Sequence, residues 1–251
     1  VYSLLPRESD VCDVYKPAAA RNKAIGLQTH IADIFRPAIL PTTILSSLLS
    51  LGVQSAAYSI SNFLFVFLTL ERGLPGAVAG ACVLFNSAGG FFGFLTNAYI
   101  SDRIGRRLVF RLFGVGFMLT ATFYLFAPLG SSVPALMAAG FVYGFFQFGS
   151  YASFGPYFTE LFPTEVRGTG QAFAYNFGRA ASAVFFTGVA LVAASGVVLS
   201  TAMAMFAIGG ACCSILATFL LPETAGRTLH GLDDLDAATE DKSVGNVATE
   251  S

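Results

Sequence analysis

Six long apolar stretches constrain the fold of this chain more than any other feature. Each is long enough to cross the hydrocarbon core of a bilayer, which takes about 20 helical residues. The polar/apolar alternation expected of barrel strands is missing, and a lone helix satisfies its own backbone in lipid. We therefore predict an all-α membrane protein with six transmembrane helices. The predicted spans are approximately residues 39–70, 76–99, 108–127, 134–158, 169–193 and 197–221.

The composition agrees with a lipid-solvated chain and excludes several function classes. Hydrophobic residues make up 55% of the sequence and charged residues 12%, whereas soluble domains carry about 25% charged residues. The net charge of −1 gives no indication of a nucleic-acid partner. The four cysteines lack metal or disulfide spacing, so we expect neither a metal site nor a cofactor. No nucleophile–base spacing or phosphate loop indicates an enzyme.

The basic residues predict the orientation in the membrane. They precede the first span, cluster between the second and third spans and follow the last one, whereas Arg72 stands alone on the opposite side. Because cytoplasmic loops are enriched in Lys and Arg, both termini are expected in the cytoplasm. Residues 1–38 would form a cytoplasmic linker, and residues 222–251 an acidic, disordered cytoplasmic tail.

Polar side chains follow one face of three predicted spans at intervals of four residues. Such a stripe faces protein or water rather than lipid. For any one residue, a hydrogen bond between helices explains the pattern as well as contact with a ligand does. Three stripes together favour a water-filled cavity with an amphipathic wall. With an isolated asparagine in the second span, the candidate binding residues are Gln54, Tyr58, Asn62, Asn86, Gln147, Tyr151, Tyr175, Asn176 and Arg179.

Arg179 is the most unusual of these residues. It lies about eleven residues, or about 16 Å, into its span, near the middle of a core roughly 30 Å thick. An arginine at that depth costs about 2.5–3.5 kcal/mol, and none of the six stretches offers an acid there. Its partner is then an amide such as Asn86, an acid from outside this chain, or an anionic ligand. Since a guanidinium binds carboxylate through two bonds, we favour a substrate carboxylate over a structural ion pair.

The turn between the second and third spans, "NAYISDRIGRR" from Asn97 to Arg107, combines an acid with three arginines. Asp102 can pair with the arginines or face the positive N-terminus of a helix, and Gly105 permits a tight turn. These charges could simply anchor the chain at the membrane surface. They could also form contacts that break when two helix bundles move apart.

This turn resembles the loop signature G-x-L-a-D-R-x-G-R-R of the major facilitator superfamily, with Ala98 in place of the leading glycine. "TELFPTEVRGTGQAFAYNFGR" (Thr159 to Arg179) is similar to the loop between spans 10 and 11 in the metabolite:proton symporter branch, which includes sialate, lactate and aromatic-acid permeases. "LPETAGRTL" (Leu221 to Leu229) is similar to the sequence after span 12.

The resemblance implies that the six helices form one half, spans 7–12, of a twelve-helix major facilitator fold in the plasma (cell inner) membrane. The other half would be a partner, and residues 1–38 the end of a central loop. The implied function is proton-coupled uptake of a small organic anion by alternating access. A cytoplasmic latch is implied for Asp102, Arg103, Gly105, Arg106, Arg107, Glu160, Glu165, Arg167, Glu223 and Arg227.

Two alternatives stay open. A sugar porter shares the loop signatures, although this chain has no Trp and its first stripe has one glutamine, Gln54. A truncated, non-transporting remnant or scaffold is the second, since the chain starts at Val1 and we expect it to be a fragment. Proton coupling is implied by the resemblance only, because the six stretches contain no mid-membrane carboxylate.

Overall fold

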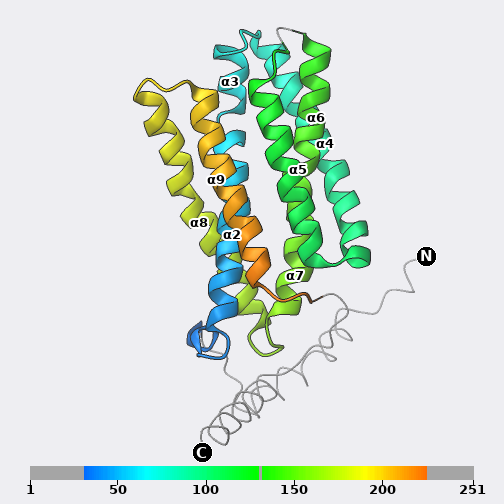
Figure 1. Ribbon diagram of the computed structural model, residues 1–251, viewed down its shortest axis with the longest axis vertical. Helices are drawn as coiled ribbons and strands as arrows, with labels where there is room; N and C mark the ends of the chain where they lie inside the picture. The colour runs from blue at the N-terminus through cyan, green and yellow to red at the C-terminus, as the bar shows by residue number, and fades with distance from the viewer. Residues whose placement is uncertain (1–30, 130–131, 225–251) are drawn as a thin grey trace, which may run out of the picture.

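The computed structural model describes residues 31–129 and 132–224 (Figure 1). Most of the predicted linker, the tail from residue 225 onward and Arg227 lie outside the described residues.

The described residues form an all-helical bundle with six helices long and apolar enough to cross a membrane, which confirms the predicted fold class. Two spans are interrupted. The first consists of α2 (Leu40–Ser61) and α3 (Leu64–Leu70), and the fourth of α6 (Val133–Gly149), η3 (Ser150–Ser153) and α7 (Phe154–Leu161). The remaining elements are the 3-10 turn η2 (Ile31–Phe35), α4 (Gly76–Ile104), α5 (Arg106–Phe126), α8 (Arg167–Ala194) and α9 (Leu199–Leu220).

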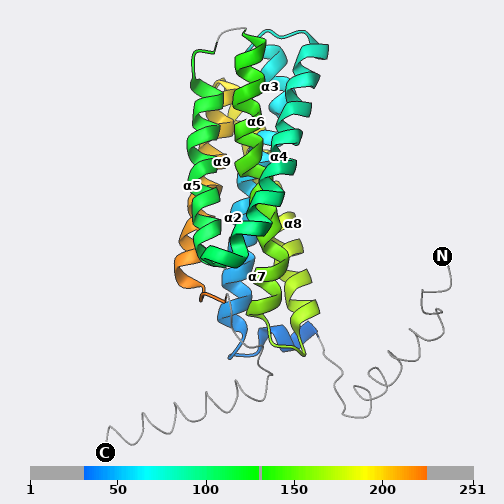
Figure 2. The same cartoon turned by 90° about the vertical axis from the view of Figure 1, so that its right-hand side faces the viewer.

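The helices form two groups, α2 with α8 and α9, and α4 with α5 and α6 (Figures 1 and 2). Glycines permit the closest approaches. A Cβ atom on Gly89 or Gly93 of α4 would lie 1.9 Å from a carbonyl oxygen of α6. A Cβ atom on Gly178 of α8 would lie 2.4 Å from the Ser50 hydroxyl of α2. Because backbones meet at these points, each glycine fixes the rotation of its helix about its own axis.

Helix α4 continues to Ile104, past the expected end near residue 99, and Gly105 then ends it. The polar residues of its last turn keep the helical hydrogen bonds, so they do not stop the helix. Gly105 has a φ of 97°, a conformation that side chains disfavour. The chain therefore reverses within one residue, and α5 begins at Arg106.

Charged side chains join α5 and α9 at the end of the bundle that carries α3. Arg72 donates from Nη2 to the carbonyl oxygens of Tyr124, Leu125 and Ala127, at the C-terminal end of α5, at 3.0–3.1 Å. Glu71 accepts a hydrogen bond of 2.9 Å from the backbone N–H of Ser200 at the N-terminus of α9. Each charge has the sign that stabilises the helix end it meets.

Exposure differs between the spans. In the most apolar segment of each span, 61% of the residues are buried for α2–α3 but 17% for α8. The span α2–α3 is therefore the centre of the bundle, and α8 presents much of its surface to lipid or to another protein segment.

Candidate functional site

An open groove lies between α2 and α8, beside the C-terminal end of α2 at Ser61. Its volume is about 340 Å³. Close packing of Gly178 against α2 leaves the next residue, Arg179, on the exposed side of α8. The groove is lined by Tyr58, Asn62, Arg179, Ser182, Ala183 and Phe186.

The Arg179 side chain has no hydrogen-bond or ion-pair partner among the residues that the structure describes. Asn86 is not that partner, since its amide donates to the Gly140 carbonyl oxygen at 3.2 Å and is buried between α4 and α6. The guanidinium donors of Arg179 therefore remain available to an anion in the groove.

Three tyrosines lie around this arginine. Tyr151 is within electrostatic range of Tyr58, Tyr175 and Arg179. The rings of Tyr151 and Tyr175 both meet the ring of Phe154 edge-on, with centroids 5.7 Å apart in each pair. Asn176 is exposed on α8, and its amide donates to the Ala172 carbonyl oxygen at 2.9 Å. Residues of all three predicted stripes thus gather on one face of the bundle.

Tyr151 also lines a second hollow, of about 370 Å³, between α4 and α6. Its other walls are mainly the aromatic rings of Phe91, Phe94 and Phe148. These phenylalanines were not among the residues predicted from the sequence. With 26 Phe in the chain, aromatic residues in a membrane helix carry little signal of their own.

The remaining candidates are buried between helices and do not line the Arg179 groove. Gln54 donates from Nε2 to the Ser50 hydroxyl at 2.8 Å and to the Tyr175 carbonyl oxygen at 2.9 Å. Gln147 donates to the Ala57 carbonyl oxygen at 3.3 Å and to the Ser61 hydroxyl. In this structure these amides join α2 to its neighbours.

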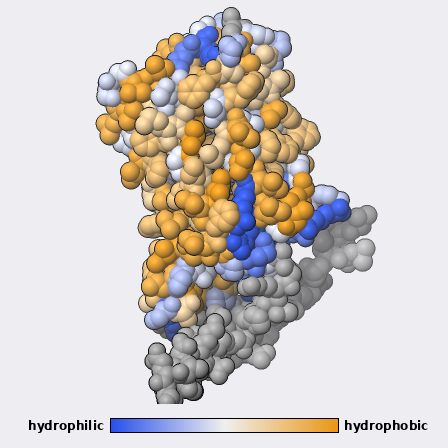
Figure 3. Space-filling model, in the orientation of Figure 1, coloured by the Kyte–Doolittle hydropathy of each residue, from blue (hydrophilic) through white to orange (hydrophobic). Residues whose placement is uncertain are grey.

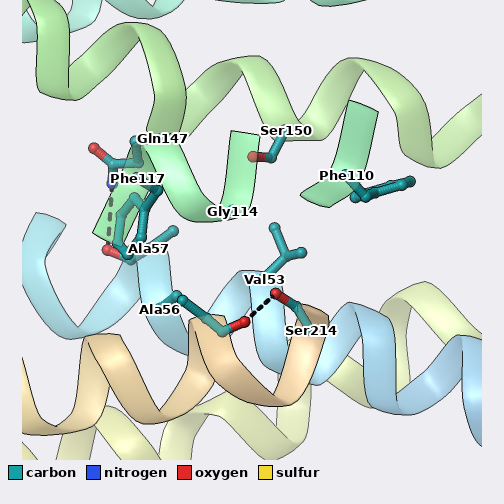
Figure 4. Close-up of a pocket in the computed structure, with 10 residues that line it drawn as sticks. Val53, Ala56, Ala57, Phe110, Gly114, Phe117, Gln147, Ser150 and Ser214 are labelled. Carbon is teal, nitrogen blue, oxygen red and sulfur yellow. Dashed lines mark hydrogen bonds between the residues drawn. The ribbon is translucent and has the colours of Figure 1, made fainter. Parts of the chain in front are cut away.

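Gln147 also borders a small cavity with Ser150 and Ser214 (Figure 4). The cavity measures about 20 Å³, which is room for one water-sized molecule.

A charged network lies at the opposite end of the bundle from α3, and Arg106 is its centre. The Arg106 guanidinium contacts Glu160 of α7 at 2.9 Å and Asp102 of α4 at 2.6 Å. It also donates to the Ser101 hydroxyl at 2.8 Å. Arg106 is only 8% exposed, so these contacts compensate a charge that is largely removed from water.

Glu223 completes the network from the far end of α9. Its carboxylate accepts the backbone N–H groups of Arg106 and Arg107 at 2.9 and 3.1 Å, at the N-terminus of α5. A Cβ atom on Gly105 would lie 3.0 Å from a Glu223 oxygen. Glycine at this position therefore permits the backbone conformation of the turn and leaves room for the Glu223 carboxylate. The neighbouring Thr224 hydroxyl donates to Glu160 at 2.6 Å.

The other predicted latch residues are arranged differently. Arg103 lies over the Tyr99 ring at 4.2 Å, and Arg107 donates to carbonyl oxygens of α9. Arg167 donates to the Thr164 hydroxyl at 3.2 Å, and Glu165 is partly exposed in the same loop. Ser101 and Thr224 were not predicted from the sequence, although Thr224 directly follows Glu223 in "LPETAGRTL".

Comparisons with known proteins agree with this architecture. The family model described as "Major Facilitator Superfamily" matches residues 47–233. The chain is 33% identical, over 84% of its length and 48% of the relative's, to a Cupriavidus pinatubonensis protein named "Probable 4-methylmuconolactone transporter". It is 26% identical to the "Cis,cis-muconate transport protein" of Acinetobacter baylyi, over 57% of this chain and 34% of that protein.

Among solved structures, the inward-open xylose transporter XylE from E. coli superposes with a TM-score of 0.58. The alignment covers 73% of this chain and 48% of that one at 19% identity, so it supports the fold alone. The chain spans about half the length, or less, of the curated relatives it matches. This multi-pass integral membrane chain, whose described residues contain six membrane-capable helices, therefore belongs to the major facilitator superfamily of transporters, and its fold corresponds to half of such a carrier.

Proposed function

We propose that this chain forms the C-terminal half of a carrier for small organic anions and that Arg179 binds the substrate carboxylate. The exposed guanidinium of Arg179, which has no partner among the described residues, carries the proposal. A charge near mid-membrane without a partner marks a ligand or pathway site by default. The names of two relatives support the substrate class, since both refer to transport of muconate or a muconolactone.

The proposed binding surface consists of Arg179 with the residues around it. Tyr58, Tyr151 and Tyr175 would contact the body of the anion, and Asn62 and Asn176 would supply weaker polar contacts. The six-helix half opposite would close the site during alternating access. Gln54, Gln147 and Asn86 would act indirectly, by holding the helices that carry these groups.

The proposal also covers orientation and coupling. We place the Arg106 network at the cytoplasmic face of the plasma membrane, because basic residues concentrate at that end. The contacts of the Arg106 side chain with Asp102 and Glu160 would act as a latch that changes as the two halves rock. In the described part of the chain, every Asp and Glu lies near a helix end or in a connecting loop. Proton coupling would therefore need a titratable group elsewhere in the carrier.

Uptake by the complete reading frame that contains this chain tests the proposal. We would compare cis,cis-muconate, 4-methylmuconolactone and the neutral sugar xylose, in cells that express wild type, Arg179→Lys or Arg179→Gln. Loss of a charge-assisted bond predicts that Arg179→Gln raises the half-saturating acid concentration by about 10- to 100-fold. Arg179→Lys keeps the charge but loses the two-bond geometry, so its half-saturating acid concentration should lie between those of wild type and Arg179→Gln.

Arg36→Gln is the matched control, because Arg36 is an exposed arginine that pairs with Asp33 and belongs neither to the groove nor to the predicted latch. It should leave the half-saturating concentration unchanged. An unchanged apparent affinity for the acids in both Arg179 variants would contradict the proposal. Saturable uptake of xylose alone would favour the sugar-porter alternative. No uptake of any compound by membranes that contain the protein would favour the non-transporting remnant.

A further inference from the structure

Arg107 and Arg111 form a second basic site, one helical turn apart on α5 and beside the C-terminal end of α9. Figure 3 shows a hydrophilic strip between the lower ends of these helices, within an otherwise hydrophobic face. Neither arginine forms an ion pair with a carboxylate among the described residues. The proposed transport mechanism uses neither of these guanidinium groups.

Hydrogen bonds fix both side chains against α9. Arg107 donates from Nε to the Thr218 carbonyl oxygen at 2.8 Å and from Nη2 to that of Phe219 at 2.9 Å. Arg111 donates from Nε to the Thr218 hydroxyl and from Nη2 to its carbonyl oxygen, both at 3.0 Å, and lies 3.9 Å over the Phe219 ring. These bonds leave Nη1 of each guanidinium without a partner among the described residues.

The surroundings of the two arginines are apolar and exposed. Their neighbours on α5 and α9 are 44–70% exposed; these are Leu108, Leu112, Leu216, Phe219 and Leu220. Helix α5 has 21 residues, or about 31 Å, which is about the thickness of the hydrocarbon core. Arginines in its first two turns therefore lie where lipid headgroups meet the acyl chains, and the site opens toward lipid.

We propose that Arg107 and Arg111 bind the phosphate of an anionic phospholipid, whose acyl chains lie along the exposed leucines of α5 and α9. Guanidinium groups bind phosphate through paired, charge-assisted hydrogen bonds. Pre-positioned side chains lose little freedom when the headgroup binds. A soluble phosphate ester would satisfy the arginines but leave the apolar neighbours uncovered, which is why the site takes a lipid.

The test uses the complete reading frame that contains this chain, purified in a neutral detergent. Native mass spectrometry would count bound lipids after addition of palmitoyl-oleoyl phosphatidylglycerol or of phosphatidylcholine with the same chains. Wild type should prefer phosphatidylglycerol. In the Arg107→Gln/Arg111→Gln double variant, the preference for phosphatidylglycerol over phosphatidylcholine should be about tenfold lower. Arg103→Gln, which removes a neighbouring arginine stacked on Tyr99, should keep it.

Two results would overturn the proposal. The first is an undiminished preference for phosphatidylglycerol in the double variant. The second is binding of glycerol phosphate as tight as that of the lipid, which would make the site one for a soluble ester. If the double variant does not fold, the Arg111→Gln single variant is tested instead. A reduced preference for phosphatidylglycerol is expected, and an unchanged preference would contradict the proposal.

Discussion

Arg106 and Arg179 are the same residue type in opposite circumstances. Arg106 is 8% exposed and contacts two carboxylates and a hydroxyl. Arg179 is exposed in a groove and has no partner among the described residues. A charge surrounded by its own chain contributes to the fold, since removing one partner leaves an uncompensated buried ion. A charge without such partners is available to a group that arrives and leaves.

Glu160→Ala is the variant for which we expect the largest change in stability. It removes the bidentate partner of a largely buried arginine, while Asp102 remains. We expect the free energy of unfolding to fall by about 2–3 kcal/mol, less than for a fully buried pair because Glu160 keeps some contact with water. Thermal unfolding in detergent measures it. A loss equal to that of Asp102→Ala, whose side chain is 69% exposed, would contradict the assigned burial.

Gly105→Ala should follow in size. The residue has a φ of 97°, and an added Cβ atom would lie 3.0 Å from a Glu223 oxygen. Backbone strain alone predicts a loss of about 1–2 kcal/mol. Gly155→Ala is the control, because nothing lies within 4 Å of a Cβ atom there. Equal stability of the two variants would show that the turn does not need glycine.

Glu223→Gln should cost less. The amide keeps one acceptor for the α5 N-terminus but loses the negative charge that the helix dipole favours. We expect a loss of about 0.5–1 kcal/mol. High salt should shrink the difference from wild type if charge is its origin. A loss that persists undiminished at high salt would indicate lost hydrogen bonding instead.

Arg179→Gln should have the smallest effect on stability. Because the side chain has no partner in the described part of the chain, its removal should change the free energy of unfolding by about 0.5 kcal/mol or less. The same variant is expected to impair acid uptake strongly. A large loss of stability in the complete carrier would instead indicate a structural ion pair with the opposite half.

The fold and the position of one charged network were predictable for identifiable reasons. Apolar length predicts the six helices, and the charged turn at Asp102 predicts a network that the structure centres on Arg106. Arg179 stood out in the sequence because a mid-membrane arginine is costly, and its role in binding stays a prediction. Each of these features depends on one segment alone, so it can be read from the sequence of that segment.

Other parts depend on how the helices are rotated. Gln54 lies on the same stripe as Tyr58, yet its amide is buried against α8 while Tyr58 lines the groove. The stripe predicts a polar face but does not say which part of that face meets a neighbouring helix. Contacts at glycines such as Gly178 decide this. They arise between segments far apart in the sequence, so no pattern within one helix reveals them.

The charged caps on α5 and α9 have a mechanical consequence. Glu71 and Arg72 hold one end of this helix pair, whereas Glu223 and Arg107 hold the other. Sliding one helix along the other by a single residue, about 1.5 Å, would stretch hydrogen bonds at both membrane surfaces at once. The two helices are therefore held in register and should move as one rigid unit. Any bending of this half is then expected in the interrupted spans α2–α3 and α6–α7.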